Sequence, residues 1–252
     1  MRLSHLVGLL GITLVSSVGC RENDPAKLYV GAASNVQDAL TQIVDSFTYH
    51  TGVDVALVFN SSGNITTQVE QGLPIDIFVS ADMHYPTSLH QEGYTLQPPE
   101  VYCRGRLAII TSGADIYPSF EAMGQPDINK VAIANPKVAP YGQKAMIALK
   151  NAGVLNSVRD KLIYGTNISQ AHQFVDSGAS DIGITARALV DTLKDHWALI
   201  PDDLYGPLAQ GIVMIRRDDQ NEAAMSAFYD FMFSEVAIEV LDSYGYLTDT
   251  SL

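Results

Sequence analysis

The sequence is poor in basic residues and in cysteine, and it has no long hydrophobic run after its first twenty residues. Its 252 residues include 15 Lys and Arg against 28 Asp and Glu, which leaves a formal net charge of -13. No cluster of Lys or Arg relieves that charge, so the surface repels phosphate backbones and a nucleic-acid partner is excluded. Heptads, internal repeats and low-complexity tracts are also missing from the sequence, which indicates an ordinary globular protein.

The sequence also lacks the motifs of common enzyme classes. It contains neither the G-x-S-x-G turn of hydrolases nor the G-x-x-x-x-G-K-[ST] loop that binds nucleotides. The six histidines are scattered, and no pair has metal-ligand spacing with a third partner. His172 is interpreted as a solvated helix residue, and Asp76 and Asp82 as structural or hinge residues. We therefore expect a protein that is not an enzyme, that holds no cofactor or metal, and that cannot power transport itself.

The first twenty residues resemble a bacterial export signal. Arg2 is followed by a charge-free, mostly apolar run over residues 3–19 and then by Cys20, which is the arrangement of a secretory signal peptide. The run is shorter than the roughly 20 residues of a membrane-spanning helix. Residues 17–20 (SVGC) resemble a lipobox, in which the cysteine is acylated and becomes the first mature residue, although Ser17 stands in place of the usual Leu.

We therefore expect a signal peptide over residues 1–19, a lipidated Cys20 and a polar tether over residues 20–26. The protein is then periplasmic or at the cell surface, and it contacts a bacterial membrane only through its lipid. Lipidation leaves Cys103 as the single thiol, so no disulfide is expected. An ordinary soluble secreted protein that is cut elsewhere is the alternative.

From residue 27 the chain alternates short apolar runs with amphipathic segments. Val36, Leu40, Ile43 and Phe47 recur at helical spacing, whereas residues 53–59 are rich in β-branched side chains. The predicted strands are 28–32, 53–59, 75–79, 106–111, 131–134, 162–164, 182–185 and 211–215. The predicted helices are 36–51, 65–71, 143–152, 169–177, 221–233 and 235–244.

Strands that alternate with helices of this length predict β-α-β units and parallel sheets. The units form two similar series, so we expect an α/β protein with two lobes, residues 27–104 plus 211–252 and residues 105–210. The chain is expected to cross between the lobes, and to hinge, near 102–106 and 205–211. Secreted two-lobed α/β proteins of this size are similar to solute-binding proteins, in which the ligand lies in the crevice at the carboxyl ends of the strands.

Four loops that follow predicted strands have a similar composition and position. Each is rich in small or polar residues and leads into a predicted helix; they are 33–35, 60–64, 135–142 and 165–168. Helix N-termini carry free N–H groups and partial positive charge, so several that point at one spot make an anion site without a cationic side chain. Ser and Asn are also preferred helix caps, so each loop alone is explained by capping. The set, two loops in each lobe, favours an anion site.

Six segments resemble, in order and with natural spacing, the molybdate-binding protein of bacterial ABC transporters, the ModA family. They are 31–35 (GAASN), 60–63 (NSSG), 72–82 (GLPIDIFVSAD), 139–142 (APYG), 165–171 (GTNISQA) and 179–183 (ASDIG). The resemblance covers nearly all of residues 27–246. It implies a two-lobed type II periplasmic binding fold, each lobe a mostly parallel sheet flanked by helices. It also implies that molybdate or tungstate is held in the cleft between the lobes by neutral donors only.

The resemblance further implies which residues bind the oxyanion; they are Ser34, Asn35, Ser62, Tyr141 and Ile168. The two serines supply hydroxyl and backbone N–H groups, Asn35 a backbone N–H, and Ile168 only its backbone N–H. Tyr141 lies in the A-P-x-G loop, where the family supplies a backbone N–H and some members a Tyr hydroxyl. Many members place another Tyr ligand where this chain has Ala186, and we expect Tyr141 to replace it from the opposite side.

Molybdate is a proton-free dianion near neutral pH and only accepts hydrogen bonds. Phosphate still carries a proton, for which the four loops offer no carboxylate acceptor, and sulfate is smaller and sits loosely among fixed donors. We therefore expect a monomeric extracytoplasmic solute-binding protein that captures molybdate or tungstate and delivers it to the permease and ATPase subunits of an ABC transporter. Two alternatives remain: an accessory oxyanion-sensing protein, and a receptor for another oxyanion such as sulfate or a phosphonate.

Overall fold

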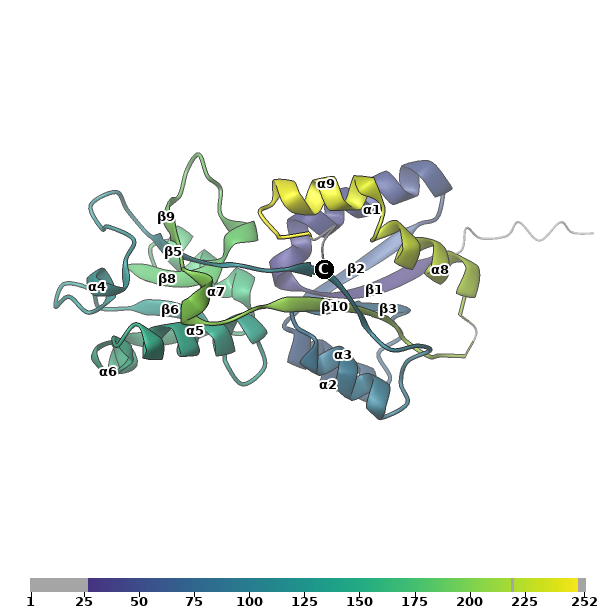
Figure 1. Ribbon diagram of the computed structural model, residues 1–252, viewed down its shortest axis with the longest axis horizontal. Coiled ribbons are helices and arrows are strands. Elements are labelled where there is room, and N and C mark those ends of the chain that lie inside the picture. The colour runs from purple at the N-terminus through teal and green to yellow at the C-terminus, as the bar shows by residue number, and fades with distance from the viewer. Residues whose placement is uncertain (1–26, 219, 249–252) are drawn as a thin grey trace, which may run out of the picture.

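The protein has two lobes that lie end to end along its long axis (Figure 1). The computed structural model describes residues 27–218 and 220–248, and each lobe is built on a five-stranded sheet. The predicted signal peptide (1–19), the tether (20–26) and Cys20 lie outside the described residues. Within the described ranges, no helix is both long and apolar enough to cross a membrane.

The sheet of the first lobe has the strand order β2-β1-β3-β10-β4. Its strands are β1 (Leu28–Ala33), β2 (Val55–Asn60), β3 (Ile77–Val79), β4 (Glu100–Arg104) and β10 (Ala209–Met214). β1 is parallel to β2 and β3, whereas β10 is antiparallel to β3 and β4. Ala33 pairs with Asn60 at the last position of the β1–β2 ladder, so these strands end at the same edge of the sheet.

Helices cover both faces of this sheet. α1 (Gln37–Thr51), α8 (Glu222–Phe231) and α9 (Glu235–Ser243) lie on one face, and α2 (Ser62–Glu70) and α3 (His84–Gln91) on the other (Figure 1). Because side chains alternate along a strand, Ile77 and Val79 of β3 join the core beneath α1, α8 and α9. Phe78 joins the core beneath α2 and α3. The sheet is therefore buried on both sides, as parallel strands require.

The second lobe repeats this architecture with the strand order β7-β6-β8-β5-β9. Its strands are β5 (Leu107–Thr111), β6 (Val131–Ala134), β7 (Leu162–Gly165), β8 (Ile182–Ala186) and β9 (His196–Leu199). Its helices are α4 (Phe120–Met123), α5 (Pro140–Asn151), α6 (Leu155–Val158) and α7 (Ile168–Asp176). Short 3-10 turns lie at Arg159–Lys161 (η2), Arg187–Leu189 (η3) and Asp202–Leu204 (η4), and the first lobe has one at Ser34–Val36 (η1). Ile133 of β6 packs with Leu149 of α5, and Ala132 packs with Val175 of α7 on the opposite face.

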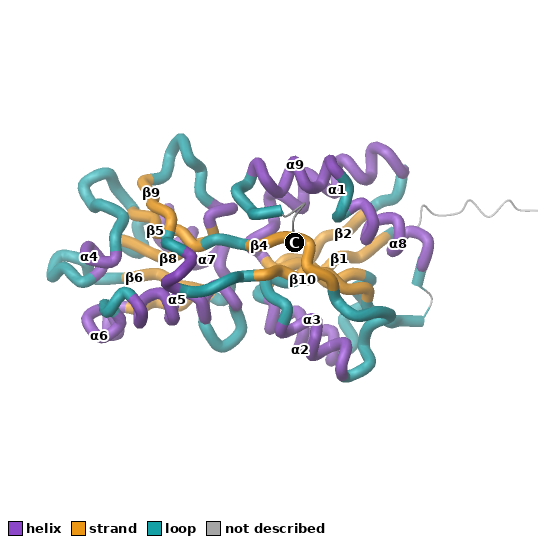
Figure 2. The backbone as a smooth tube through the Cα atoms, viewed as in Figure 1, coloured by secondary structure: helices purple, strands orange, loops and turns teal. Residues whose placement is uncertain are grey.

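The chain crosses between the lobes twice. Residues 105–106 join β4 to β5, and residues 200–208 join β9 to β10 (Figure 2). β5 and β10 are the strands that arrive from the other lobe, and each is antiparallel to both of its neighbours. The remaining four strands of each sheet share one direction, so the carboxyl ends of β1, β2 and β3 point toward those of β6, β7 and β8. The predicted two-lobed α/β fold is confirmed.

Candidate functional site

A small buried cavity lies where the strand ends of the two lobes meet. Ten described residues line it: Ala33, Ser34, Asn35, Ser61, Ser62, Ala81, Ala139, Pro140, Tyr141 and Ile168. Its open volume is only about 10 Å³, so the two lobes close tightly around this point.

The five residues that the resemblance singles out all line this cavity, and they come from both lobes. Ser34 and Asn35 follow β1 directly, and Ser62 begins α2 one residue after β2. Tyr141 lies in the first turn of α5, which follows β6, and Ile168 begins α7, which follows β7. Chain segments as far apart as η1 and α7 therefore meet at one point.

Two of the helices begin earlier than the sequence pattern predicts. α2 begins at Ser62 and α5 at Pro140, each three residues before its predicted start. Ser61 caps α2 by accepting a hydrogen bond from the N–H of Asn64, and a proline is well suited to the first turn because it has no N–H to leave unpaired. Ser62 and Tyr141 therefore belong to first helical turns, where backbone N–H groups are free of intrahelical partners.

The four predicted loops also contain Ala33, Ser61, Ala139 and Pro140 of the lining, but sequence reasoning missed Ala81, which lies outside them. Ala81 follows β3, whose carboxyl end lies at the same edge as those of β1 and β2. The rule that ligands bind at strand ends could have identified this third loop of the first lobe. Ala186, where many relatives carry a Tyr, is fully buried at the end of β8 and does not line the cavity.

No charged side chain occurs among the ten lining residues that the structure describes. Ser34, Asn35, Ser62 and Tyr141 are each at most 2% exposed. Burial raises the pKa of the Tyr141 hydroxyl well above its ordinary value, so the hydroxyl keeps its hydrogen at physiological pH. The site is therefore neutral and can hold a negative charge only through hydrogen-bond donors and helix dipoles.

Each hydroxyl in the lining already accepts a hydrogen bond from the protein. The Ser169 N–H donates to Ser34 Oγ over 3.4 Å and the Ala81 N–H to Ser62 Oγ over 3.0 Å. The Asn64 N–H donates to Ser61 Oγ over 3.4 Å, and Gln210 Nε2 to the Tyr141 hydroxyl over 2.9 Å. None of these hydroxyls donates to another residue in the described part of the chain. Their hydrogens are therefore available to a guest.

The lining contains one exception to this donor character. Asn35 Oδ1 is buried and has no hydrogen-bond partner among the described residues. It is a side-chain acceptor at the cavity wall, although the amide nitrogen of the same side chain is engaged elsewhere. A guest with a proton of its own therefore meets a single unpaired side-chain acceptor.

Direct contacts between the lobes surround the cavity. Ser169 Oγ donates to the carbonyl oxygen of Ser34 over 2.9 Å, and the Gly63 N–H donates to the carbonyl oxygen of Val138 over 2.9 Å. A Cβ at Gly63 would lie 2.9 Å from that same Val138 oxygen. Gly63 thus allows one lobe to approach the other, and the structure is a closed arrangement of the two lobes.

Asp76 and Asp82 lie outside the lining. Asp76 is buried, accepts a hydrogen bond from the Tyr29 N–H and pairs with Arg217 over 3.4 Å. Asp82 accepts from the Tyr85 N–H at the start of α3, and burial raises the pKa of its carboxyl. Both carboxylates hold local structure together, in agreement with their interpretation from the sequence.

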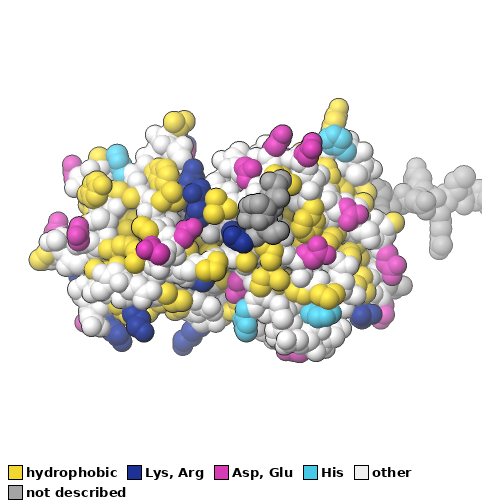
Figure 3. Space-filling view, in the orientation of Figure 1, with side chains coloured by type: hydrophobic (Ala, Val, Ile, Leu, Met, Phe, Trp, Pro, Cys, Tyr) yellow, Lys and Arg dark blue, Asp and Glu magenta, His cyan; other side chains and the backbone are white. Residues whose placement is uncertain are grey.

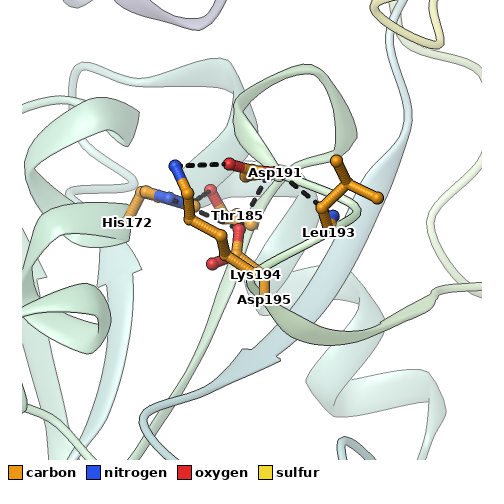
Figure 4. Close-up of polar contacts among 6 residues, drawn as sticks. All are labelled: His172, Thr185, Asp191, Leu193, Lys194 and Asp195. Carbon is orange, nitrogen blue, oxygen red and sulfur yellow. Dashed lines mark hydrogen bonds and ion pairs between the residues drawn. The ribbon is translucent and has the colours of Figure 1, made fainter.

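His172 is largely buried, so its interpretation as a solvated residue is wrong. Its Nδ1 lies 3.2 Å from Thr185 Oγ1 and its Nε2 lies 4.0 Å from Asp195 Oδ2 (Figure 4). In the neighbouring loop, Lys194 pairs with Asp191 over 2.8 Å. Burial lowers the pKa of His172. This cluster does not touch the cavity, and the described residues contain no group of three or more His, Cys, Asp or Glu that could hold a metal.

A family model described as bacterial extracellular solute-binding protein matches residues 28–247. The chain belongs to this family. Solute-binding proteins of this kind are transport proteins rather than a class of enzymes.

Its similarity to molybdate-binding proteins extends over the whole chain. ModA of Rhodobacter capsulatus is 31% identical over 244 residues, which are 96% of this chain and 93% of that protein. ModA of Azotobacter vinelandii is 32% identical over 253 residues, 97% of each chain. The solved structure of the periplasmic molybdate-binding protein of Azotobacter vinelandii superposes with a TM-score of 0.83 at 26% identity, over 88% of this chain and all of that one. The resemblance to the ModA family is confirmed.

Proposed function

We propose that this solute-binding protein captures molybdate or tungstate outside the cytoplasm and delivers it to the permease and ATPase subunits of an ABC transporter. The observation that carries the proposal is the neutral cavity between the lobes, whose hydroxyls are all occupied as acceptors. The names of its relatives in Rhodobacter and Azotobacter support the choice of anion.

Binding in this proposal uses donors from both lobes. Ser34 and Ser62 donate from the first lobe through hydroxyl and backbone N–H groups, and Asn35 donates its backbone N–H. Tyr141 and Ile168 donate from the second lobe, Tyr141 through both its hydroxyl and its backbone and Ile168 through its backbone only. About six or seven bonds from these eight donor groups, each charge-assisted bond contributing roughly 1.5–3 kcal/mol, offset the cost of closing two lobes and support nanomolar binding. No cofactor has a role.

The same donor set explains how related oxyanions are distinguished. A phosphate proton finds no carboxylate in the lining, where Asn35 Oδ1 is the one unpaired side-chain acceptor among the described residues; a proton that does not reach that atom costs about 1–3 kcal/mol. Sulfate has no proton but is smaller than molybdate, so fixed donors cannot all reach it. Tungstate has nearly the size of molybdate and is expected to bind equally well.

Calorimetric titration of the purified mature protein with molybdate, tungstate, sulfate and phosphate tests this proposal. We expect tight binding of molybdate and tungstate and much weaker binding of the other two. Tight sulfate or phosphate binding together with weak molybdate binding would replace the proposed ligand. A protein that binds none of the four would overturn the proposal as a whole.

We also propose that the protein is a monomer anchored through an acylated Cys20 after removal of residues 1–19. The support is the sequence pattern around residues 17–20. Mass spectrometry of the N-terminal peptide from membranes of expressing bacteria tests the lipid, and Cys20→Ala is expected to release the protein into the soluble fraction. An unmodified peptide that begins at another residue would favour an ordinary secreted protein.

A further inference from the structure

Gln210 lies behind the cavity wall at the junction of the two lobes. It is fully buried on β10, at the point where the pairing of β10 with β4 shifts register between Gln210 and Gly211. Its side chain does not line the cavity, but its Nε2 lies 2.9 Å from the Tyr141 hydroxyl, which does. The bond joins a strand of the first lobe to a helix of the second.

The donor and the acceptor of each hydrogen bond around Gln210 can be assigned by starting from one backbone carbonyl. The carbonyl oxygen of Asn35 can only accept, so the Tyr246 hydroxyl 2.8 Å away must donate to it. That hydroxyl has one hydrogen, so it must accept from the Asn35 side chain, 2.9 Å away. The atom of Asn35 that faces Tyr246 is therefore the amide nitrogen, Nδ2.

The same reasoning extends to Gln210. Asn35 Nδ2 is a donor, so the Gln210 atom 2.9 Å from it must be the acceptor Oε1, which also accepts from the Tyr102 hydroxyl over 2.9 Å. The other end of the Gln210 amide is then Nε2, which can only donate. Tyr141 therefore accepts from Gln210, and its own hydrogen must point to a different partner.

Two features indicate that this arrangement is specified by the fold. A Cβ at Gly105, in the first crossing between the lobes, would clash with both the Tyr141 hydroxyl and Gln210 Nε2, so glycine leaves the space in which the two groups meet. The orientation of the Asn35 amide also leaves Asn35 Oδ1 buried without a partner among the described residues. An unpaired buried acceptor destabilises the protein. The direction of these hydrogen bonds is therefore maintained at a cost in stability.

We propose that Gln210 is a positioning residue, which holds the Tyr141 hydroxyl as a donor toward the oxyanion and thereby favours guests without a proton. Gln210 does not touch the ligand and acts only through Tyr141. The inference rests on the proposed function, because it assumes that a tetrahedral oxyanion occupies the cavity. It makes Tyr141 a directed donor rather than a hydroxyl that is free to turn.

A double-mutant cycle on Gln210 and Tyr141 tests the proposal. Gln210→Glu keeps the shape of the side chain and an acceptor for Asn35 and Tyr102, but its carboxylate takes the hydrogen of Tyr141. Tyr141→Phe removes that hydrogen and is expected to weaken molybdate binding about tenfold. Gln210→Glu is expected to weaken it at least as much, because it also adds a like charge. The double variant is expected to bind molybdate no more weakly than Gln210→Glu alone. If the two substitutions acted independently, their fold losses of affinity would multiply in the double variant.

A second variant keeps the test decisive if the buried carboxylate impairs folding. Gln210→Met has a similar size and no donor, so the Tyr141 hydroxyl can turn and accept the proton of phosphate. The ratio of phosphate to molybdate affinity is expected to rise about fivefold, while the ratio of sulfate to molybdate affinity stays constant because sulfate has no proton. Tyr205→Phe is the control, since it removes another buried hydroxyl, bonded to Leu107 and Asp202 beside the second crossing, without touching Gln210.

The outcomes separate this inference from the proposed function. If wild type binds none of molybdate, tungstate or sulfate, the proposed function fails and this inference with it. If wild type binds one of them, the cycle is measured with that ion. The role of Gln210 would then be overturned, and the proposed function would stand, in either of two cases. The fold losses of affinity could multiply in the double variant, or both affinity ratios could rise equally in Gln210→Met.

Discussion

A hydroxyl group can donate or accept a hydrogen bond, and each hydroxyl of this cavity receives an N–H from a neighbour. Three of these neighbours are backbone groups, at Asn64, Ala81 and Ser169, and the fourth is the side chain of Gln210. A hydroxyl that accepts a hydrogen bond from the protein still has its own hydrogen to donate to a guest. The groups that orient these hydroxyls include residues that do not line the cavity, such as Gln210.

The hydroxyls of Ser62 and Tyr141 are expected to contribute comparable binding energies from opposite lobes. Ser62→Ala and Tyr141→Phe should each weaken molybdate binding by about 1–2 kcal/mol, because each deletes one charge-assisted donor. Calorimetry measures the change. Tyr164→Phe is the matched control, since Tyr164 lies on β7 in the second lobe with half of its surface exposed. An unchanged affinity for Tyr141→Phe would mean that another group supplies the donor missing at Ala186.

Gly105 permits the close approach of Tyr141 and Gln210, so Gly105→Ala is expected to separate them. A Cβ at this position would lie closer to both groups than real Cβ atoms approach their neighbours. We expect a loss of stability of about 1–3 kcal/mol from overpacking and a weakening of molybdate binding similar to that of Tyr141→Phe. Thermal denaturation and calorimetry measure the two effects.

Gly113→Ala controls for the glycine substitution itself. A Cβ at Gly113 meets no atom within 4 Å, and its backbone does not require a positive φ. It should leave both stability and affinity nearly unchanged. If Gly105→Ala behaved like Gly113→Ala, the close packing around the Tyr141 hydroxyl would have no role in binding.

At the scale of elements, the helix that begins at Ile168 brings its N-terminus to the cavity and depends on a single side-chain cap. Asn167 Oδ1 accepts a hydrogen bond from the Gln170 N–H over 2.9 Å. Asn167→Ala is expected to destabilise the protein by about 1 kcal/mol. It should also weaken molybdate binding by about 0.5–1 kcal/mol, because a frayed first turn directs its N–H groups and dipole less well.

Asn221→Ala provides a matched control for the cap. Asn221 caps α8 by accepting from the Ala224 N–H over 3.0 Å, far from the cavity lining. This variant should lose similar stability in thermal denaturation but keep its affinity for molybdate. Equal losses of affinity in both variants would show that α7 acts only through overall stability.

The elements themselves were predictable where local pattern and tertiary environment agree. The strand over residues 131–134 is found at its predicted bounds because it is apolar throughout and buried on both faces. β4 (Glu100–Arg104) was missed because it has charged residues at both ends and is specified by pairing with β10, about a hundred residues later. α3 was missed because Pro86 interrupts the helical pattern, although a proline is tolerated in a first turn.

The candidate site was predictable to a similar extent. Ser34 and Ser62 stand in local motifs, so their positions follow from short stretches of sequence. Gln210 stands in no motif, and its contact with Tyr141 spans 69 positions of the chain. Only the folded arrangement of the two lobes reveals that contact.

On the scale of the whole molecule, acidic side chains are spread over both lobes on the face shown in Figure 3. A net charge of -13 repels an anion at long range, but salt screens this repulsion beyond about 8 Å at physiological ionic strength. The binding energy must therefore come from short-range donors in the buried cavity. Those donors belong to different lobes, so binding and closure of the lobes are one equilibrium.

Ser169 links the lobes directly and is expected to set the position of that equilibrium. Its hydroxyl, at the start of α7, donates to the Ser34 carbonyl over 2.9 Å and lies 3.3 Å from the side-chain amide of Gln37, both in the first lobe. Ser169→Ala removes these bonds from the closed form only, so the closed population should fall about fivefold. Molybdate affinity should fall by up to that factor, because the ligand must first restore the closed form.

Solution scattering with and without molybdate measures this shift. Unliganded Ser169→Ala is expected to have a larger radius of gyration than unliganded wild type, and saturating molybdate should bring both to the same compact shape. Ser177→Ala is the control at the other end of α7, because within the described part of the chain its hydroxyl bonds only to carbonyls of its own helix. A variant that kept wild-type dimensions without ligand, yet bound molybdate more weakly, would place the role of Ser169 in direct contact with the anion rather than in closure.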